Sequence, residues 1–287
     1  MNNPWNNRRP SARPPRATPL PRAEVPAAEP GAGGGGGGGG GRSNNEELRL
    51  FGVNAVLAAF NRRPQAVRKI YLLEALIPRM QPLLKWCVAN RVGYRVVEDG
   101  DLNKLSGTTH HEGIVADVQR APVLTLAEWL DALPPGPRLA LWLDGVGNPH
   151  NLGAILRSAA HFGAAGLLLS EGSTLGISGA AARVAEGGAE AVPLVRLPDR
   201  DEAMSQLRQA GFGLAATLVD GGANVFSAAL PERLVYVMGA EGEGMDRQLA
   251  TQCDLQVSIP GSGAVESLNV ASATAVLLAQ WSARRLA

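Results

Sequence analysis

The chain has 287 residues, 45% of them hydrophobic and 18% charged, which is enough apolar material for one large or two small cores. No stretch approaches the roughly 18 consecutive apolar residues of a membrane-spanning helix, and the N-terminus has no apolar core of a secretory signal. The cysteines, Cys87 and Cys253, form no CxxC or Cys/His cluster, so we expect no metal site and a cytoplasmic protein with reduced thiols.

The N-terminal segment, residues 1–44, is rich in Pro, Ala, Arg and Gly and ends in the run Gly33 to Gly41. Such a composition cannot bury enough surface to offset the entropy of ordering, so we expect a disordered tail with a flexible glycine linker. Residues 1–45 hold six arginines and two glutamates, a net +4, which leaves −3 on the remainder of a chain of formal charge +1. A basic arm suits loose phosphate contacts, and it equally suits a solubilising tail.

Residues 45–120 are predicted to form a small α/β domain. The apolar residues Val53, Val56, Leu57 and Phe60 follow i, i+3, i+4, i+7 spacing, which is typical of an amphipathic helix. The other expected elements are strands at 70–73, 94–97 and 114–118 and a helix at 78–90. Residues 121–138 contain four prolines around one short amphipathic piece, so we expect them to connect two domains.

From residue 139 to the end, at 287, strands and helices alternate. We expect strands at 139–143, 167–169, 214–217, 234–238 and 255–259, a helix over 152–160 that ends at Gly163, and a closing helix over 268–284. Strands separated by helices predict an α/β fold with a mostly parallel sheet covered on both faces.

Three segments of this second part carry residues suited to chemistry. The first runs from Asp144 through a Gly/Asn/Pro loop to Asn151 and Arg157 on the following helix. Loops at the carboxyl ends of parallel strands bind ligands in open α/β folds, and an arginine there could hold a phosphate bidentately. The alternative is that Asn151 only caps the helix and Arg157 is a solvated surface charge.

The second segment follows the strand at 234–238 and contains Gly239, Glu241, Gly242 and Gly244. Glycines let a ligand approach the backbone closely, although an ordinary glycine-rich turn has the same composition. Because neither the G-x-G-x-x-G order nor a GK[ST] loop is present, the segment gives little support to a nucleotide-dependent oxidoreductase and none to ATP chemistry.

The third segment runs from Ile259 and Pro260 through Gly261 to Ser267, Leu268 and Asn269. It leads into a helix of small residues, which permit close backbone packing. Ser267 and Asn269 are candidates for polar contacts in a site, and they could equally be the N-terminal cap of that helix.

The order and spacing of the three segments resemble the three signature motifs of the SpoU (TrmH) family of the SPOUT methyltransferases. Asn151 to Arg157 looks like motif 1, Gly239 to Gly244 like motif 2, and Ile259-Pro260 with Ser267 to Val270 like motif 3. Residues 50–118 look like the L30e-like substrate-binding domain that precedes the SPOUT domain. The family often has methionine where this chain has Gly261, which implies a looser adenine pocket.

The resemblance implies S-adenosylmethionine-dependent 2′-O-ribose methylation of RNA, a trefoil-knotted parallel sheet and a homodimer. Gly239, Glu241, Gly242, Ile259 and Leu268 would surround the cofactor. Arg157 would orient the ribose, stabilise the developing oxyanion and be a candidate to accept the proton. The other residues expected to orient Arg157 and the substrate are Asn151, Glu241, Ser267 and Asn269. No metal is required.

We also expect RNA contacts from the first domain. Arg62, Arg63, Arg68 and Lys69 cluster after its first helix, and His110 and His111 lie before its last strand. The alternative for each is a solvated charged face. A separate first domain favours ribosomal RNA of the 23S type as the target, and tRNA remains an alternative. A non-catalytic RNA-binding or ribosome-assembly protein is a further alternative, although the motif residues are all present.

Overall fold

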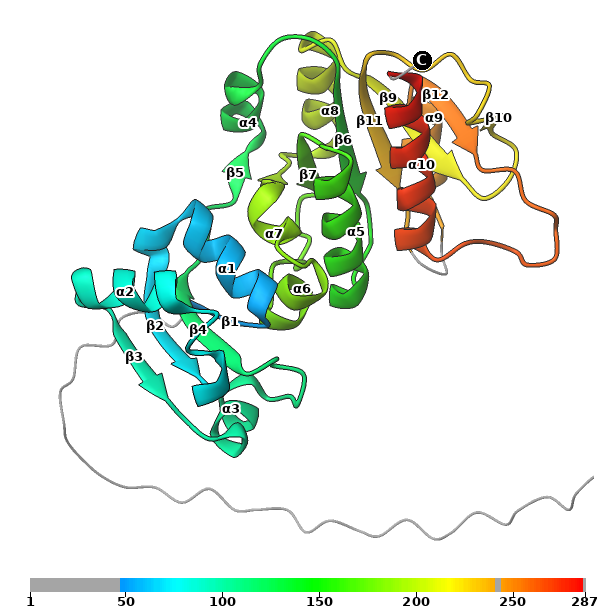
Figure 1. Cartoon of the computed structure of the whole chain (residues 1–287). Coiled ribbons are helices and arrows are strands. Elements are labelled where there is room, and N and C mark those ends of the chain that lie inside the picture. The colour runs from blue at the N-terminus through cyan, green and yellow to red at the C-terminus, as the bar shows by residue number, and fades with distance from the viewer. Residues whose placement is uncertain (1–46, 241–243, 286–287) are drawn as a thin grey trace, which may run out of the picture. The chain divides into compact units, whose positions relative to one another are not determined.

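The computed structural model describes residues 47–240 and 244–285 (Figure 1). The predictions made for the tail, residues 1–44, and for Glu241 and Gly242 therefore lie outside the described residues. The described chain contains two sheets, each with its own helices. Its two cysteines, Cys87 and Cys253, are both free thiols. No helix in the described ranges is long and apolar enough to cross a membrane.

The first sheet has four strands in the order β1-β4-β2-β3, with β1 and β2 antiparallel to β4 and β3 parallel to β2. Its strands are β1 (Glu47–Phe51), β2 (Val67–Leu72), β3 (Gly93–Val96) and β4 (Ile114–Gln119), and its helices are α1 (Val53–Arg62), α2 (Gln81–Ala89) and α3 (Asp99–Ser106). Of the apolar stripe predicted on the first helix, Val53 and Val56 are buried in the core of this domain, and Leu57 and Phe60 are partly buried against it. Two short 3₁₀ helices, η1 (Pro64–Ala66) and η2 (Glu74–Leu76), flank β2.

The second sheet has eight strands in the order β10-β12-β9-β11-β6-β7-β8-β5, and every neighbouring pair is parallel. Its strands are β5 (Leu124–Thr125), β6 (Arg138–Leu143), β7 (Gly166–Leu169), β8 (Leu194–Arg196), β9 (Gly213–Leu218), β10 (Ala223–Asn224), β11 (Arg233–Met238) and β12 (Leu255–Ser258). The predicted α/β class with a parallel sheet is confirmed.

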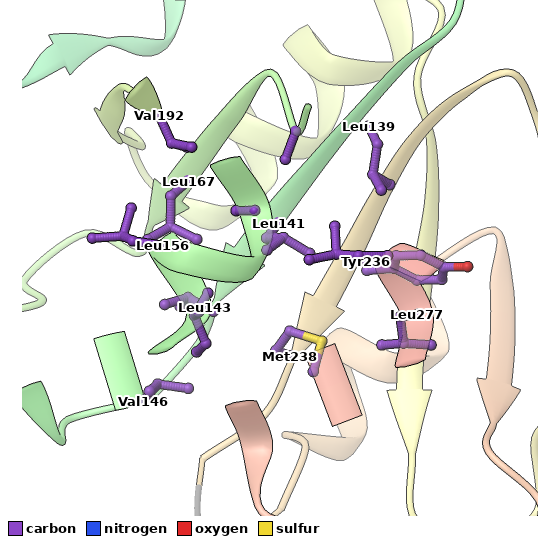
Figure 2. Close-up of a cluster of buried hydrophobic side chains, with 14 of the residues drawn as sticks. Leu139, Leu141, Leu143, Val146, Leu156, Leu167, Val192, Tyr236, Met238 and Leu277 are labelled. Carbon is purple, nitrogen blue, oxygen red and sulfur yellow. The ribbon is translucent and has the colours of Figure 1, made fainter. Parts of the chain in front are cut away.

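Helices cover both faces of the second sheet, as its apolar strands require. The helices are α4 (Leu126–Ala132), α5 (Pro149–His161), α6 (Gly179–Val184), α7 (Gly188–Ala191), α8 (Arg200–Gln209), α9 (Arg247–Gln252) and α10 (Val270–Arg284). Successive side chains of β6 point to opposite faces of the sheet. Leu141 packs with α5 and α10, and Trp142 packs with α4, α8 and α9. Figure 2 shows the first cluster, with Tyr236 of β11 beside Leu277 of α10.

Residues 121–138 differ from the connection that was expected. They add β5 to the second sheet beside β8, and α4 packs on that sheet through Trp129. The indole nitrogen of Trp129 donates a hydrogen bond to the carbonyl of Ala165 at 3.0 Å, and its ring stacks on Phe212. The prolines lie at the ends of this segment and not inside its elements, which is why they allow both a strand and a helix.

Candidate active site

The three motif segments begin at one edge of the second sheet. Because β6 and β11 are parallel neighbours with Met238 opposite Leu143, the loops that follow them leave the sheet side by side. β12 ends at Ser258, which pairs with Leu218 at the end of β9, the other neighbour of β11. The carboxyl edge of a parallel sheet is where open α/β folds bind ligands, so the topology brings the three segments to one candidate site.

The first motif enters α5 through a cap, but not at Asn151, the residue for which a cap was the alternative interpretation. The cap is Asn148, whose side chain accepts a hydrogen bond from the amide of His150 at 2.9 Å, and Pro149 follows in the first turn. Asn151 instead lies inside the helix and is only 9% exposed. A cap is therefore not the reason for an asparagine at position 151.

Asn151 joins the first motif to the third. The side-chain amide of Asn269 donates a hydrogen bond to Oδ1 of Asn151 at 3.2 Å, across 118 residues of sequence. Asn269 is also the N-cap of α10, since its Oδ1 accepts hydrogen bonds from the amides of Ala271 and Ser272. The cap that was considered for Asn269 is therefore present, and the same side chain also holds α10 to α5.

Arg157 lies on α5, and its side chain is exposed. The backbone at this point is fixed by α7, because a Cβ on Gly188 would come within 3.0 Å of the Cα of Arg157. The helix rise puts Arg157 roughly 9 Å along the axis from Asn151. The guanidinium is thus held on a rigid helix and remains accessible to a substrate.

After β11 the backbone turns tightly, so that Gly239 and Ala240 lie against Gly244. A Cβ on Gly239 would lie 2.6 Å from the carbonyl of Gly244, and the amide of Gly244 donates a hydrogen bond to the carbonyl of Ala240. Gly145 of the first motif also approaches Ala240 and has φ +80°. The turn itself therefore requires a glycine at position 239, because a larger residue would collide with Gly244.

Asp246 ends this segment and caps α9, accepting hydrogen bonds from the amides of Gln248 and Leu249. The hydrogen bond from the amide of Leu249, with that from Arg200, keeps the pKa of the Asp246 carboxyl below its ordinary value. The glycine turn is thus anchored at its C-terminal end by a charged cap.

The third motif spans the loop between β12 and α10. Ile259 is half-buried and packs on the core, whereas Ser267, Leu268 and Asn269 lie at the exposed end of the loop. Leu268 is 48% exposed and Val265 is 72% exposed, which is unusual for apolar side chains in this protein. The loop therefore presents apolar side chains on the surface.

Sequence reasoning did not assign roles to a hydrogen-bonded chain at the end of β6. The indole of Trp142 donates to Oγ of Ser170 at 2.7 Å, and Ser170 donates to Oδ1 of Asp144 at 2.7 Å. The backbone amide of Asp144 also donates to the carbonyl of Met238, the last residue of β11. The position of Asp144 directly after a buried strand is the signal that could have identified it.

The proposed RNA-binding residues of the small domain fall into different environments. Arg62, Arg68, Lys69 and His110 are exposed. Arg63 forms a bidentate ion pair with Glu190, at 2.7 and 2.8 Å, and so holds α1 to α7.

His111 is only 2% exposed and accepts a hydrogen bond from the amide of Gly113 at its Nδ1. A side chain buried to this extent has no surface for RNA, so the prediction for His111 is not supported. Its role is to shape the turn before β4. Within the described residues no group of three or more His, Cys, Asp or Glu side chains could hold a metal ion.

Two family models match the chain. The SpoU rRNA Methylase family matches residues 138–279, and the model for RNA 2′-O ribose methyltransferase substrate binding matches residues 49–124. A protein of Escherichia coli O157:H7 named "Uncharacterized tRNA/rRNA methyltransferase YfiF" is 38% identical over 82% of this chain and 68% of its own length. The "23S rRNA (guanosine-2′-O-)-methyltransferase RlmB" of Ralstonia nicotianae is 37% identical over 80% of this chain and 92% of its own length.

Solved structures show the same fold. The SpoU methyltransferase AviRb from Streptomyces viridochromogenes, crystallised in complex with the cofactor AdoMet, is 25% identical, with a TM-score of 0.71 over 85% of this chain and 93% of that one. The likeness thus covers both sheets and not the catalytic part alone.

Proposed function

Because the chain belongs to the SpoU rRNA methylase family, we propose that it transfers a methyl group from S-adenosylmethionine to a ribose 2′-hydroxyl of RNA, specifically of 23S-type ribosomal RNA. The observation that carries this proposal is the meeting of the three motif segments at one sheet edge, with Asn269 bonded to Asn151. The name of the E. coli relative, which mentions both tRNA and rRNA, makes a tRNA ribose the second candidate.

The residues at the sheet edge fit S-adenosylmethionine. The exposed Leu268, the half-buried Ile259 and the tight turn at Gly239 offer apolar contacts and backbone groups, which are the partners that a purine ring needs. We propose that Gly239, Glu241, Gly242, Ile259 and Leu268 hold it. When bound, S-adenosylmethionine supplies a methyl group on a positively charged sulfur.

Arg157 is the proposed catalytic residue. Its planar guanidinium can hold a ribose oxygen and a phosphate together and can offset the negative charge that develops on the attacking oxygen. Because a protonated guanidinium has no lone pair, charge stabilisation is its main role in this proposal, and only a deprotonated guanidine could accept the hydroxyl proton. Asn151, Glu241, Ser267 and Asn269 orient Arg157 and the substrate in this proposal.

The remaining features of the proposal follow from the family. Residues 45–120 bind the RNA substrate, the working unit is a homodimer, and the protein acts in the cytoplasm. The trefoil knot is supported by the strand order, since β11 lies between β9 and β6 while β12 lies beyond β9, and α10 returns to pack on α5.

The test uses the full chain with isotopically labelled S-adenosylmethionine and two unmodified transcripts, 23S rRNA and a tRNA pool. After nuclease digestion, mass spectrometry should find a labelled 2′-O-methylnucleoside in the rRNA. Label in the tRNA alone would move the activity to the second candidate. Label on a base, or no transfer to either RNA, would refute ribose methylation.

A further inference from the structure

A cavity of about 400 Å³ lies between the two sheets of the described chain. One wall comes from the small domain, namely β1 and the loop between α3 and β4, and the other from the first turn of α5 and from α6. Its volume falls in the range of small-ligand sites. None of the residues assigned to cofactor binding lines it, so it is a different site.

The cavity is built by fixed contacts between its walls. Gly179 of α6 sits so close to β1 that a Cβ there would lie 2.7 Å from the ring of Phe51. Glu112 accepts a hydrogen bond from the amide of Val53 and pairs with Arg183 of α6 at 3.3 Å. Outside the pocket, the Arg63–Glu190 ion pair adds a further link between the small domain and α7. The space is therefore a shaped pocket between rigid elements.

The lining of the pocket combines basic side chains with apolar ones such as Phe51, Leu105 and Val184. It contains Arg49, Arg183, His110 and His150 and no carboxylate. Arg49 is paired with Asp117 at 2.7 Å, which raises its pKa. Arg183 is paired with Glu112 through Nε, but no hydrogen bond within the described ranges uses its Nη1 or Nη2. Arg183 thus has donors suited to a phosphate, and the two exposed imidazoles offer flat faces for a base.

The pocket and the proposed catalytic residue share one helix, α5, through His150 and Arg157. His150 and Arg157 are seven residues apart on α5, so they share one face of the helix and are separated by roughly 10 Å along its axis. An RNA strand whose ribose is at Arg157 reaches the pocket within a few nucleotides.

We propose that this pocket receives an unstacked nucleotide of the substrate RNA that flanks the methylated ribose. Arg183 bonds its phosphate, and His110 and His150 contact its base. RNA-binding proteins commonly read single-stranded segments by such splayed-out bases. This inference rests on the proposed function, because that function makes RNA the substrate. The position of the pocket then implies that the bound nucleotide flanks the methylated ribose.

The first variant fills the pocket and leaves its charges unchanged. Ala180, an exposed lining residue of α6, is replaced in Ala180→Tyr, and Ala132→Tyr, at an exposed alanine of α4, is the matched control. Arg183→Gln removes the phosphate donor and keeps an amide that can face Glu112. Binding of an unmodified 23S rRNA transcript and of S-adenosylmethionine is measured for each variant, together with methyl transfer.

Ala180→Tyr and Arg183→Gln should weaken RNA binding by about tenfold or more, while their affinity for S-adenosylmethionine and the RNA affinity of Ala132→Tyr stay within about twofold of wild type. RNA affinity of Ala180→Tyr within about twofold of wild type overturns the pocket proposal alone. A wild-type protein that binds the transcript but methylates no ribose overturns the proposed function and leaves the pocket result readable. A wild-type protein that does not bind the transcript overturns both.

Discussion

At the scale of single residues, the proposed catalytic role of Arg157 can be tested directly. If its guanidinium offsets charge that appears only in the transition state, Arg157→Ala should lower the rate of transfer by about 100-fold or more and leave cofactor affinity unchanged. Arg157→Lys keeps the charge but loses the planar fork, so it should also be severely impaired. Single-turnover transfer at saturating RNA and cofactor measures this rate directly.

The control for Arg157 is Arg208→Ala, an exposed arginine of α8 on the opposite face of the second sheet. Its transfer rate should stay close to that of wild type. A rate for Arg157→Ala within about threefold of wild type would show that the surface-charge interpretation of this residue is the right one.

Gly239 is a second residue whose role can be tested separately. Gly239→Val places a branched side chain against the backbone of Gly244 and Met245, so the turn must open. If this turn holds the cofactor as proposed, calorimetric affinity for S-adenosylmethionine should fall steeply, by about tenfold or more. Gly93→Val, where a Cβ meets nothing within 4 Å, is the control. Unchanged affinity in a folded Gly239→Val protein would remove Gly239 from the site.

The sequence suggested candidate site residues but not the contacts that hold them. Strand-end loops pointed to Asn151, Arg157 and Asn269, but only the fold shows that Asn148 is the cap and that Asn151 is bonded to Asn269. His111 and His110 are neighbours in sequence, yet one is buried and the other exposed. Burial depends on contacts between distant segments, and one sequence carries little information about such contacts.

At the scale of the helices and strands, the start of α10 combines a cap with a link to α5. Asn269→Ala removes both and should lower the free energy of unfolding by about 1 kcal/mol. Asn269→Asp keeps the acceptor for the amides of Ala271 and Ser272 but loses the donor to Asn151. We therefore expect Asn269→Asp to unfold like wild type and to transfer methyl groups more slowly.

Denaturant unfolding and single-turnover transfer separate the two effects of Asn269. Equal loss of stability in the alanine and aspartate variants would mean that the link to Asn151, and not the cap, stabilises the start of α10. Wild-type transfer in Asn269→Asp would mean that this link has no part in the chemistry.

Long periodic elements were predictable, and short ones were not. The helix predicted from Val53 and the strands at 139–143 and 234–238 were found within a residue or two, because their apolar patterns are strong. The sequence analysis missed β1, β8, α6, α7 and α9, which have six residues or fewer, and also α8, whose ten residues are mostly polar. Residues 179–191 illustrate this, since their glycines are required by packing against Phe51 and Leu156.

At the scale of the whole molecule, the two sheets are joined by ion pairs of α6 and α7 with the small domain. Glu190 is only 9% exposed, so Arg63→Ala leaves a carboxylate without its cation and should lower the free energy of unfolding by about 2 kcal/mol. Arg62→Ala, at the exposed neighbouring position, should be nearly neutral. Equal thermal or denaturant midpoints for the two variants would show that the pair does not stabilise the described fold.

The surface of the small domain makes the complementary prediction. Four basic residues cluster from the end of α1 to the start of β2. Of these four, Arg62, Arg68 and Lys69 are exposed and can reach phosphates, whereas Arg63 is held by Glu190. Each phosphate contact contributes roughly 0.7–0.9 to the slope of log affinity against log salt, because a condensed counterion is released. Replacing all three by glutamine should therefore flatten the slope for a 23S rRNA transcript by about 2 to 3 and weaken binding most at low salt. A triple glutamine variant of Arg79, Lys85 and Arg91, which are also exposed, controls for net charge. An equal change in slope for both triple variants would mean that the RNA senses the overall charge of the domain and not this particular face.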